Sequence, residues 1–323
     1  MKVTVVIPNY NGMKFMKTCL DSLRLQNYKE FKTLVIDNAS VDGSYEYVKE
    51  NYPEVEVVRL KKNYGFSGAV NKGIDLSDTP YVLLLNNDTE SDEDFVGEMV
   101  KAIEKEDEIF ACSSKMINFN DRSIMDDAGD LYSLPGWAFQ RGVGRSVDDY
   151  CEDAEVFSAC AGAAIYRKEV FDKIGKFDLK HFAYLEDIDV CYRAKIYGYK
   201  NVYCSSAIVY HVGSGTSGSK YNSFKVRLAA RNNIYVIYKN MPFLQQVVNM
   251  PFILAGFLVK YMFFNKIGFA KDYREGMIEG IKTMHKLKKV EYDENNLYNY
   301  FIIQKELIVN GLIYVKEYLN RHI

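Results

Sequence analysis

Several features that would classify this chain quickly are missing from its sequence. The 323 residues include 41 basic and 43 acidic side chains, for a formal net charge of -2. We therefore expect no nucleic acid as a partner, because no overall positive charge would attract one. The six cysteines form no CxxC pair and are Cys19, Cys112, Cys151, Cys160, Cys191 and Cys204. This scatter indicates buried thiols in a reducing compartment rather than a disulfide framework or a zinc site.

The chain also lacks a clear targeting signal and an uninterrupted membrane span. Its first residues, "MKVTVVIPNYNG", enter an apolar strand pattern without a small-residue cleavage site, which favours a cytoplasmic location. The apolar run over 250–264 is broken by Pro251 and Lys260, so it is shorter than the ~18 apolar residues of a typical span. It fits a helix lying in a bilayer interface, at the inner face of the plasma membrane, and equally a core or dimer helix.

The pattern that is present is one of strands alternating with helices. The helical spacing of Met13, Met16 and Leu20 predicts a helix after the first strand. The apolar runs that read as strands span 3–8, 33–37, 55–60 and 81–88. This alternation predicts an α/β protein with a Rossmann-like, mostly parallel central sheet flanked by helices. Ligands bind such sheets beyond the carboxyl ends of the strands.

The composition divides the chain into two parts. Residues 1–240 read as one α/β domain, with further strands over 109–117, 155–167 and 201–212 and a helix over 184–197. A long irregular segment, 118–154, is typical of a functional loop. Residues 241–323 read as a C-terminal helical extension that associates with a membrane or with a second copy of the chain.

The first candidate for chemistry is the end of the fourth apolar run, "LLLNND". If the segment is extended, Asn86 and Asp88 point the same way, and their oxygen atoms suit a hard divalent cation. A plain turn of Asn87 and Asp88 between strand and helix explains the same letters. Ser91 and Asp94 fit a capping box, so the acids that follow are expected to open a helix.

The second candidate is the glycine-rich stretch "KKNYGFSGAVNKGI" over 61–74. Gly65, Gly68 and Gly73 allow a tight loop at a helix start, where phosphates or sugars are often held. The stretch is neither a Walker sequence nor GxGxxG, and an ordinary glycine-rich turn is the alternative.

Two further candidates carry ionisable groups. Glu186 and Asp187 lie at the start of a predicted helix and are candidate general bases, whereas Asp189 and Arg193 are spaced for a helical ion pair. His211 follows a strand and precedes a Gly/Ser loop to Gly218, so it could complete a metal site or contact a phosphate. That loop is a candidate lid. A structural role is the usual alternative for a single histidine.

Together these motifs resemble the family 2 glycosyltransferases of the GT-A fold, especially their rhamnosyltransferase-like bacterial branch. The resemblance covers roughly residues 2–240 and implies that residues 1–240 form a nucleotide-sugar-binding and catalytic domain. It rests, in order, on "VVIPNYNG", "VIDNASVDGS", "NYGFSGAVNKGI", "LLLNND", "FDLKHFAYLEDIDVCYR" and "YHVGSGTS".

The resemblance implies roles for individual residues. Asp88 would be the chief ligand of Mg²⁺ or Mn²⁺, Asn86 would take the first position of the family's DxD motif, and His211 would be a further ligand. Asp187 would be the catalytic base, with Glu186 beside it. The nucleotide pocket would contain Pro8, Asn9, Tyr10, Asp37, Asn38, Asn63, Gly68, Asn71 and Asn87, with Asp37 placed to bond a uracil or thymine ring.

The activity implied is metal-dependent, inverting transfer of a sugar from dTDP-rhamnose or a UDP-sugar to a hydroxyl of a glycan or lipid-linked glycan. Such a reaction belongs to the synthesis of cell-surface polysaccharide. A sugar nucleotidyltransferase is the alternative within enzymes, although "PNYNGMKF" lacks the basic glycine-rich signature of that class. A degenerate, non-catalytic homologue that binds glycan or nucleotide is the alternative outside enzymes.

Overall fold

The computed structural model describes residues 1–213 and 221–320. The predicted lid, which runs to Gly218, lies outside these residues.

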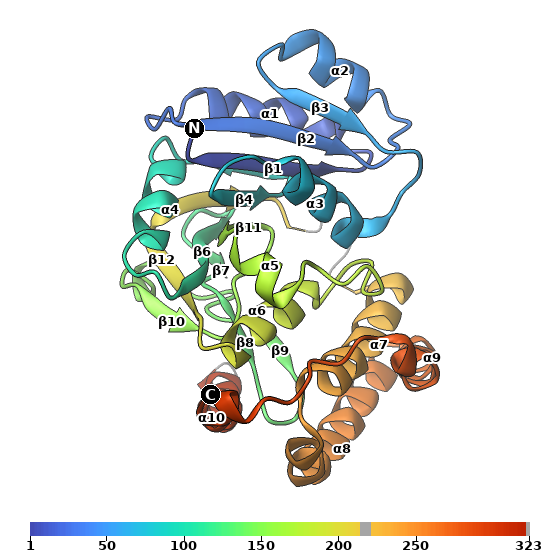
Figure 1. The fold of residues 1–323 in the computed structure, drawn as a ribbon. Helices are drawn as coiled ribbons and strands as arrows, with labels where there is room; N and C mark the ends of the chain where they lie inside the picture. The colour runs from blue at the N-terminus through green and yellow to red at the C-terminus, as the bar shows by residue number, and fades with distance from the viewer. Residues whose placement is uncertain (214–220, 321–323) are drawn as a thin grey trace.

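The amino-terminal half forms the predicted parallel sheet. Its strands are β1 (Val3–Asn9), β2 (Phe31–Asp37), β3 (Glu56–Arg59) and β4 (Tyr81–Leu85). They lie in the order β4, β1, β2, β3, and every neighbouring pair is parallel (Figure 1). The carboxyl ends of these strands therefore meet at one edge, as the sequence predicted.

The sheet continues past β4 with strands of mixed direction. They are β5 (Thr89–Ser91), β6 (Ile109–Asn118), β7 (Met125–Asp127), β10 (Ala154–Val156), β11 (Ala163–Arg167) and β12 (Lys200–His211). β11 runs antiparallel between β4 and β6, and β12 runs parallel to β6. The single strand predicted over 155–167 is wrong, because β10 and β11 are separate strands that pair with different neighbours.

Helices cover both faces of the sheet because its buried strands alternate their side chains. Val5 and Ile7 of β1 pack with α1 (Met13–Arg24) and α4 (Phe95–Ile103), whereas Val6 faces α3 (Gly65–Leu76). The remaining helices of this part are α2 (Ser44–Asn51), α5 (Val170–Ile174) and α6 (Glu186–Ile196), with a 3-10 turn at Val147–Asp149. This period-two burial gives the two apolar layers of a doubly covered sheet.

The predicted capping box before α4 is wrong. Ser91 lies in β5, and its Oγ has no hydrogen-bond partner among the described residues. The helix begins after Asp94, which makes no side-chain cap but donates its backbone N–H to Asp92 Oδ1 at 3.2 Å. The acids in this segment still precede the helix, where the helix dipole favours negative charge.

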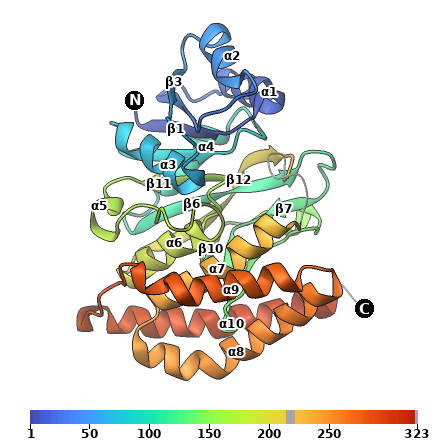
Figure 2. The same ribbon diagram turned by 90° about the vertical axis from the view of Figure 1, so that its right-hand side faces the viewer.

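The carboxyl-terminal part consists of four helices below the sheet (Figure 2). They are α7 (Ser223–Asn240), α8 (Phe243–Lys266), α9 (Ala270–Thr283) and α10 (Leu297–Asn320), with 3-10 turns at Met284–Lys286 and Glu294–Asn296. A small hairpin, β8 (Asp130–Tyr132) and β9 (Ala138–Gln140), reaches toward them. Tyr192 of α6, Ile253 of α8 and Leu307 of α10 belong to one buried cluster. The two parts predicted to meet at residue 240 therefore share this buried cluster.

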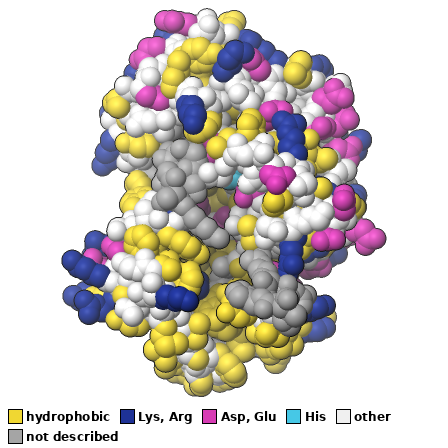
Figure 3. Space-filling view, turned by 180° about the vertical axis from the view of Figure 1, so that it is seen from behind, with side chains coloured by type: hydrophobic (Ala, Val, Ile, Leu, Met, Phe, Trp, Pro, Cys, Tyr) yellow, Lys and Arg dark blue, Asp and Glu magenta, His cyan; other side chains and the backbone are white. Residues whose placement is uncertain are grey.

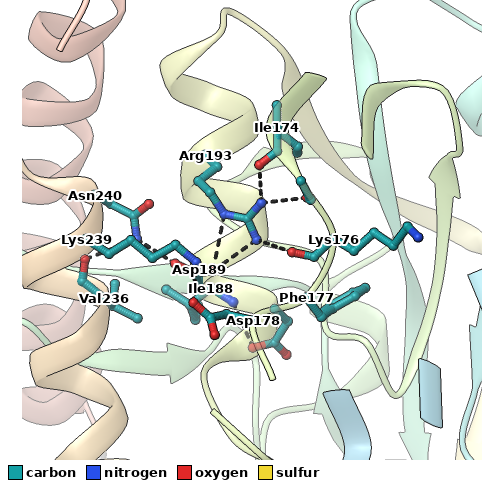
Figure 4. A network of polar contacts seen from close by, with 12 residues as sticks. Ile174, Lys176, Phe177, Asp178, Ile188, Asp189, Arg193, Val236, Lys239 and Asn240 are labelled. Atoms are coloured by element: carbon teal, nitrogen blue, oxygen red, sulfur yellow. Dashed lines mark hydrogen bonds and ion pairs between the residues drawn. The ribbon is translucent and has the colours of Figure 1, made fainter. Parts of the chain in front are cut away.

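A buried charge network fastens α6 to α7 (Figure 4). The fully buried Asp189 accepts hydrogen bonds from Arg193 Nη2 at 3.0 Å, Lys239 Nζ at 2.9 Å and Asn240 Nδ2 at 2.9 Å. Arg193 also donates to the carbonyl groups of Ile174, Gly175 and Lys176. Burial acts to raise the pKa of Asp189, but Lys239 and Arg193 outweigh it and hold that pKa well below its usual value. The predicted Asp189–Arg193 ion pair is confirmed.

We expect Asp189→Asn to lower the free energy of unfolding by about 3–5 kcal/mol, because it leaves two buried cations without their shared anion. Urea denaturation would measure the loss. Asp78→Asn, which breaks an exposed pair with Lys32, should cost under about 1 kcal/mol. Since the pKa of Asp189 is lowered on folding, its contribution is present above its unfolded pKa of about 4 and is lost as the pH falls below that value. Equal losses in both variants would contradict this account.

Candidate active site

The polar strand ends meet around Asn9, at the carboxyl end of β1. Asn9 Nδ2 donates to Asp37 Oδ1 at 3.0 Å and to Ser44 Oγ at 2.8 Å, and Asn9 Oδ1 accepts from Asn87 Nδ2 at 2.8 Å. Asn9 and Asn87 are both buried. The predicted convergence of the ends of β1, β2 and β4 is confirmed. Hydrogen bonds of the buried Asn9 and Asn87 hold these strand ends together.

Exposure differs sharply among the other predicted nucleotide-pocket residues on this edge. Asp37 is 0% exposed, and its Oδ2 accepts from Ser40 N at 3.2 Å and lies 3.5 Å from Arg59 Nε. Tyr10 is 39% exposed and Pro8 is half-buried. Tyr10 therefore offers a ring surface to a ligand, while Asp37 already has partners within the protein.

The glycine-rich loop before α3 is held by Asn38. Asn38 Nδ2 donates to Asn63 Oδ1 at 3.0 Å and to the carbonyl of Gly65 at 2.9 Å. Gly65 has a φ of +76°, and a Cβ there would lie 2.4 Å from the carbonyl oxygen of Phe182. Only glycine fits this turn, which brings the loop against the segment that precedes α6.

Asn71 and Gly68, also predicted for the nucleotide pocket, make packing contacts on α3. Asn71 donates to the carbonyl of Phe177 at 2.7 Å and accepts from its backbone N–H at 3.1 Å. A Cβ at Gly68 would lie 2.5 Å from Tyr64 Cβ. These contacts fix α3 against the residues leading into α6.

A histidine lies between two carboxylates at the end of β12. β12 pairs with β5, so that His211 is opposite Thr89 and next to Asp88. His211 Nε2 is 3.3 Å from Asp88 Oδ1, and His211 Nδ1 is 2.6 Å from Asp126 Oδ2. Burial acts to lower the pKa of His211, but the hydrogen bonds to Asp126 and Asp88 raise it to about 10. The ring thus holds a proton between two anions.

These groups fit a divalent cation. If a divalent cation replaced the proton on Nε2, Asp126 would still accept from Nδ1–H, and the Nε2 lone pair and the Asp88 carboxylate would be two acceptors facing that cation. A carboxylate oxygen with an imidazole nitrogen suits Mn²⁺ better than Mg²⁺, which prefers oxygen ligands alone.

The prediction that Asn86 and Asp88 lie in one extended strand and point the same way is wrong. β4 ends at Leu85, and Asn87 and Asp88 form a turn. Asn86 donates its backbone N–H to the carbonyl of Gly162 at 2.7 Å, which joins β4 to the segment before β11. A metal-binding role for the Asn86 side chain stays a prediction.

The acidic pair at the start of α6 approaches the same edge. Asp187 Oδ1 accepts from Ile188 N at 2.8 Å and Oδ2 from Ala161 N at 3.4 Å, one residue before Gly162. Burial raises the pKa of Asp187. Burial and the charge of Asp187 raise the pKa of Glu186 well above its usual value, and Glu186 Oε2 has no hydrogen-bond partner among the described residues. Burial and the neighbouring charge therefore disfavour the ionised form of Glu186, and the role of Asp187 as the base stays a prediction.

The turn into α6 has an unusual backbone. Phe182, Tyr184 and Leu185 all have positive φ, of 64°, 72° and 64°. Asn232 of α7 donates to the carbonyls of His181, Ala183 and Tyr184 at 2.7–2.9 Å. Left-handed conformations at non-glycine residues persist only when their surroundings enforce them, and they are common at functional sites. Asn232 supplies that constraint and so positions Asp187.

The sequence analysis missed three further acids near the site, Asp126, Asp127 and Asp130. Burial, together with the charges of Asp126 and Asp187, raises the pKa of Asp127 to about 7. Asp127 and Asp130 also lie within 4.8 Å of Cys160 through their ligand atoms. All three belong to the segment 118–154, which was assigned only as a loop. The run "DDAGD" within it was the available signal.

A sequence model of the family described as "Glycosyl transferase family 2" matches residues 4–175 of the chain. The match includes the edge formed by Asn9, Asp37 and Asp88 and ends before Asp187 and His211.

Several curated proteins are similar over about 240 residues. An uncharacterized glycosyltransferase of Bacillus subtilis is 26% identical, covering 72% of this chain and 85% of its own length. An amylovoran biosynthesis glycosyltransferase of Erwinia amylovora is 28% identical, covering 68% and 75%. An N-acetylglucosaminyl-diphospho-decaprenol L-rhamnosyltransferase of Mycobacterium tuberculosis is 24% identical, covering 66% and 77%.

Solved structures share the fold at low sequence identity. A mannosyltransferase of Pyrobaculum calidifontis, in complex with GDP-Man and Mn²⁺, has a TM-score of 0.54 at 13% identity and covers 96% of this chain and 86% of its own. GalNAc-T7 with UDP, GalNAc and Mn²⁺ has a TM-score of 0.59 at 17% identity, covering 73% and 47%. These neighbours have the GT-A fold, with the metal and nucleotide named in their own complexes.

Proposed function

Because the chain belongs to glycosyl transferase family 2, we propose that it is an inverting enzyme that transfers a sugar from a nucleoside-diphosphate sugar to a hydroxyl group of a glycan or lipid-linked glycan. The observation that carries this proposal is the meeting of two groups at one sheet edge. The Asp88–His211 pair suits the diphosphate end of the donor with its cation, and Asp187 suits the acceptor.

The donor side would be built by the strand ends and the α3 loop. Tyr10 offers the exposed ring for the base, with Pro8 beside it and Asp37, Asn38 and Asn63 shaping the pocket behind. Asp88 and His211 Nε2 would hold Mn²⁺ or Mg²⁺, with Asn86 as a further candidate ligand. A cation there supplies positive charge that stabilises the diphosphate as it leaves.

The acceptor side would be served by Asp187. Its carboxylate takes the proton of the acceptor hydroxyl while the oxygen attacks the anomeric carbon. The bond from that carbon to the diphosphate oxygen breaks on the opposite face, and the nucleoside diphosphate leaves with the electron pair. The new glycosidic bond has the inverted configuration, and no covalent enzyme intermediate is required. The backbone N–H groups of Ala161 and Ile188 hold the carboxylate for this step.

We infer that dTDP-rhamnose or a UDP-sugar is the donor and that the product belongs to a cell-surface polysaccharide. Two relatives support this choice, one named for amylovoran biosynthesis and one for rhamnosyl transfer to a decaprenol-linked sugar. A lipid-linked acceptor would bring the enzyme to the cytoplasmic face of the plasma membrane, where sugar nucleotides are made.

A panel of sugar nucleotides, each with and without Mn²⁺, tests the function as a whole. We expect one dTDP- or UDP-sugar to raise the melting temperature with Mn²⁺ and to do so much less without it, because the diphosphate is bound partly through the cation. Enzymatic release of the nucleoside diphosphate would separate an enzyme from a non-catalytic binding protein. Consumption of a nucleoside triphosphate with release of pyrophosphate would contradict the proposal and identify a nucleotidyltransferase.

We expect Asp187→Asn to lower the transfer rate roughly a hundredfold to ten-thousandfold, the usual contribution of a general base. Donor affinity with Mn²⁺, measured by calorimetry, should remain within about twofold. Glu186→Gln is the matched variant, because Glu186 is expected to be protonated already and should keep most of its activity. Turnover that survives in Asp187→Asn and disappears in Glu186→Gln would show that Glu186, and not Asp187, is the base.

Asp126 is expected to act as a positioning residue through His211. Asp126→Asn should weaken Mn²⁺ binding about tenfold to a hundredfold, the range found for carboxylates that orient metal-binding histidines. Electron paramagnetic resonance of Mn²⁺ measures this without turnover, and Asp126→Glu should restore part of the affinity. Glu90→Gln, whose carboxylate pairs with Arg122 at the surface, is the control. Unchanged Mn²⁺ affinity in Asp126→Asn would exclude the role.

A further inference from the structure

Helix α8 buries polar side chains and exposes apolar ones, the reverse of a helix packed on the core of a soluble protein. Its buried stripe contains Gln245, Asn249, Ile253 and Gly256. Gln245 and Asn249 donate to Gln304 Oε1 of α10 at 2.8 and 3.0 Å. The large apolar side chains lie outside instead, among them Phe243, Leu244, Val248, Phe252, Leu254, Leu258 and Met262, each at least 52% exposed. Polar groups are thus satisfied within the protein, and apolar ones face outward.

The neighbouring helix α10 exposes an apolar stripe on its outer side. The residues recur at helical spacing and are Phe301, Ile308, Leu312, Val315 and Leu319, from 46% to 67% exposed. Its inner side carries Ile303 and Leu307, which are buried in the shared core. Because α8 and α10 are joined through Gln304, the two outer stripes lie on adjacent helices. We call these outward residues of α8 and α10 the apolar face.

The apolar face lies at one end of the molecule. α8 is the lowest element in Figure 1, and hydrophobic side chains gather over the same end of the molecule in Figure 3. Soluble monomers seldom expose an apolar patch larger than a few hundred square ångströms, and larger patches mark interaction sites.

The charges around the apolar face identify its partner. α8 contains no acidic residue, and its two charged side chains are the half-buried Lys260 and the exposed Lys266. On α10 the charged residues classed as exposed among the described ones are Lys305 and Lys316, and Glu317 is half-buried. Glu306 turns inward to Lys195, with 3.1 Å between Nζ and Oε1. Outward lysines beside apolar stripes favour a surface that is both apolar and negatively charged.

We propose that the apolar face of α8 and α10 binds the surface of an anionic lipid bilayer, with both helices lying in the plane of the membrane. α8 is long and apolar enough to cross a bilayer by length and composition. Its polar stripe, however, is bonded to α10, and Gly256 is packed against Pro135, where an added Cβ would lie 2.3 Å from the Pro135 carbonyl oxygen. These contacts hold α8 along the protein.

The docked orientation connects the membrane to the candidate active site, and this part of the inference rests on the proposed function. The tip of the β8–β9 hairpin is clamped between the two helices: Trp137 Nε1 donates to the carbonyl of Gly256 at 3.2 Å, and Leu134 N donates to the carbonyl of Leu307 at 2.8 Å. The base of the same hairpin holds Asp130, which lies within 4.8 Å of Cys160 through their ligand atoms, and the next residue, Ala161, donates its backbone N–H to Asp187 Oδ2 at 3.4 Å. One hairpin therefore connects the inner sides of α8 and α10, behind the apolar face, to the segment that bonds Asp187, as an enzyme acting on a lipid-linked acceptor would require.

Sedimentation with lipid vesicles tests the inference without donor, metal or turnover. The full chain should bind vesicles of phosphatidylcholine with phosphatidylglycerol and bind phosphatidylcholine alone more weakly. Leu258→Glu and Leu312→Glu should each reduce binding about tenfold or more. Each replaces an exposed leucine that would be buried in the bilayer by a charged side chain. Leu25→Glu is the matched control, since Leu25 is 71% exposed on α1's side of the sheet and should have no effect.

Lysine variants test the charge argument and do not threaten folding. Lys305→Gln and Lys316→Gln should each weaken binding to the anionic vesicles about fivefold, the effect of roughly 1 kcal/mol per lysine, and leave binding to neutral vesicles unchanged.

Failure of the wild-type chain to bind either vesicle would overturn the proposal. So would a stable dimer that Leu258→Glu disperses, or resistance to alkaline extraction, which marks a spanning helix. Vesicle binding by a chain that fails the sugar-nucleotide panel would reject the proposed function alone.

Discussion

The arrangement of the site depends on one buried carboxylate, that of Asp189. A charge removed from water is tolerated only when it is paired and fully hydrogen-bonded, and Asp189 receives bonds from Arg193, Lys239 and Asn240. Two of these partners belong to α7, so the first turn of α6 cannot move independently of that helix. Asp187 lies two residues before Asp189, on the same turn. The anchored helix end therefore fixes the acid that approaches the sheet edge.

The opposite side of the site concentrates negative charge. Asp88 and Asp126 flank His211, and their hydrogen bonds raise its pKa, while burial and the charge of the adjacent Asp126 raise the pKa of Asp127. Such a cluster is stable only with bound protons or a cation, because like charges in a poorly solvated space repel strongly. An electrostatic demand for positive charge thus exists before any donor arrives. The diphosphate of a sugar nucleotide would add further negative charge, which makes the cation the natural link between protein and donor.

The sequence predicted those parts of the structure that local pattern controls. The parallel strands, the polar edge with Asn9, Asp37 and Asp88, and the Asp189–Arg193 pair all follow from periodicity and spacing. It could not predict Asp126, which reaches His211 only because β7 pairs with β6 and brings together residues 85 positions apart. The extended geometry assigned to Asn86 and Asp88 was wrong, because β4 ends at Leu85, three residues before the end of the predicted strand, and Asn87 and Asp88 form a turn. The family match ends at residue 175, so the roles of Asp187 and His211 rest on the motifs and on geometry.

The C-terminal helices show why composition alone left their role open. The run over 250–264 is apolar whether the helix is buried, spans a bilayer or lies upon one, and only the direction of Gln245 and Asn249 separates these cases. In the fold both amides point inward to Gln304, and the apolar face of α8 is exposed. A core helix would have the reverse arrangement, and a free spanning helix would have no reason to bury its polar stripe on α10. The clamp of Trp137 on Gly256 then ties this helix to the hairpin beside Asp187. This connection would help a chain that acts on lipid-linked acceptors, because docking would fix the distance between the proposed catalytic base, Asp187, and the membrane surface.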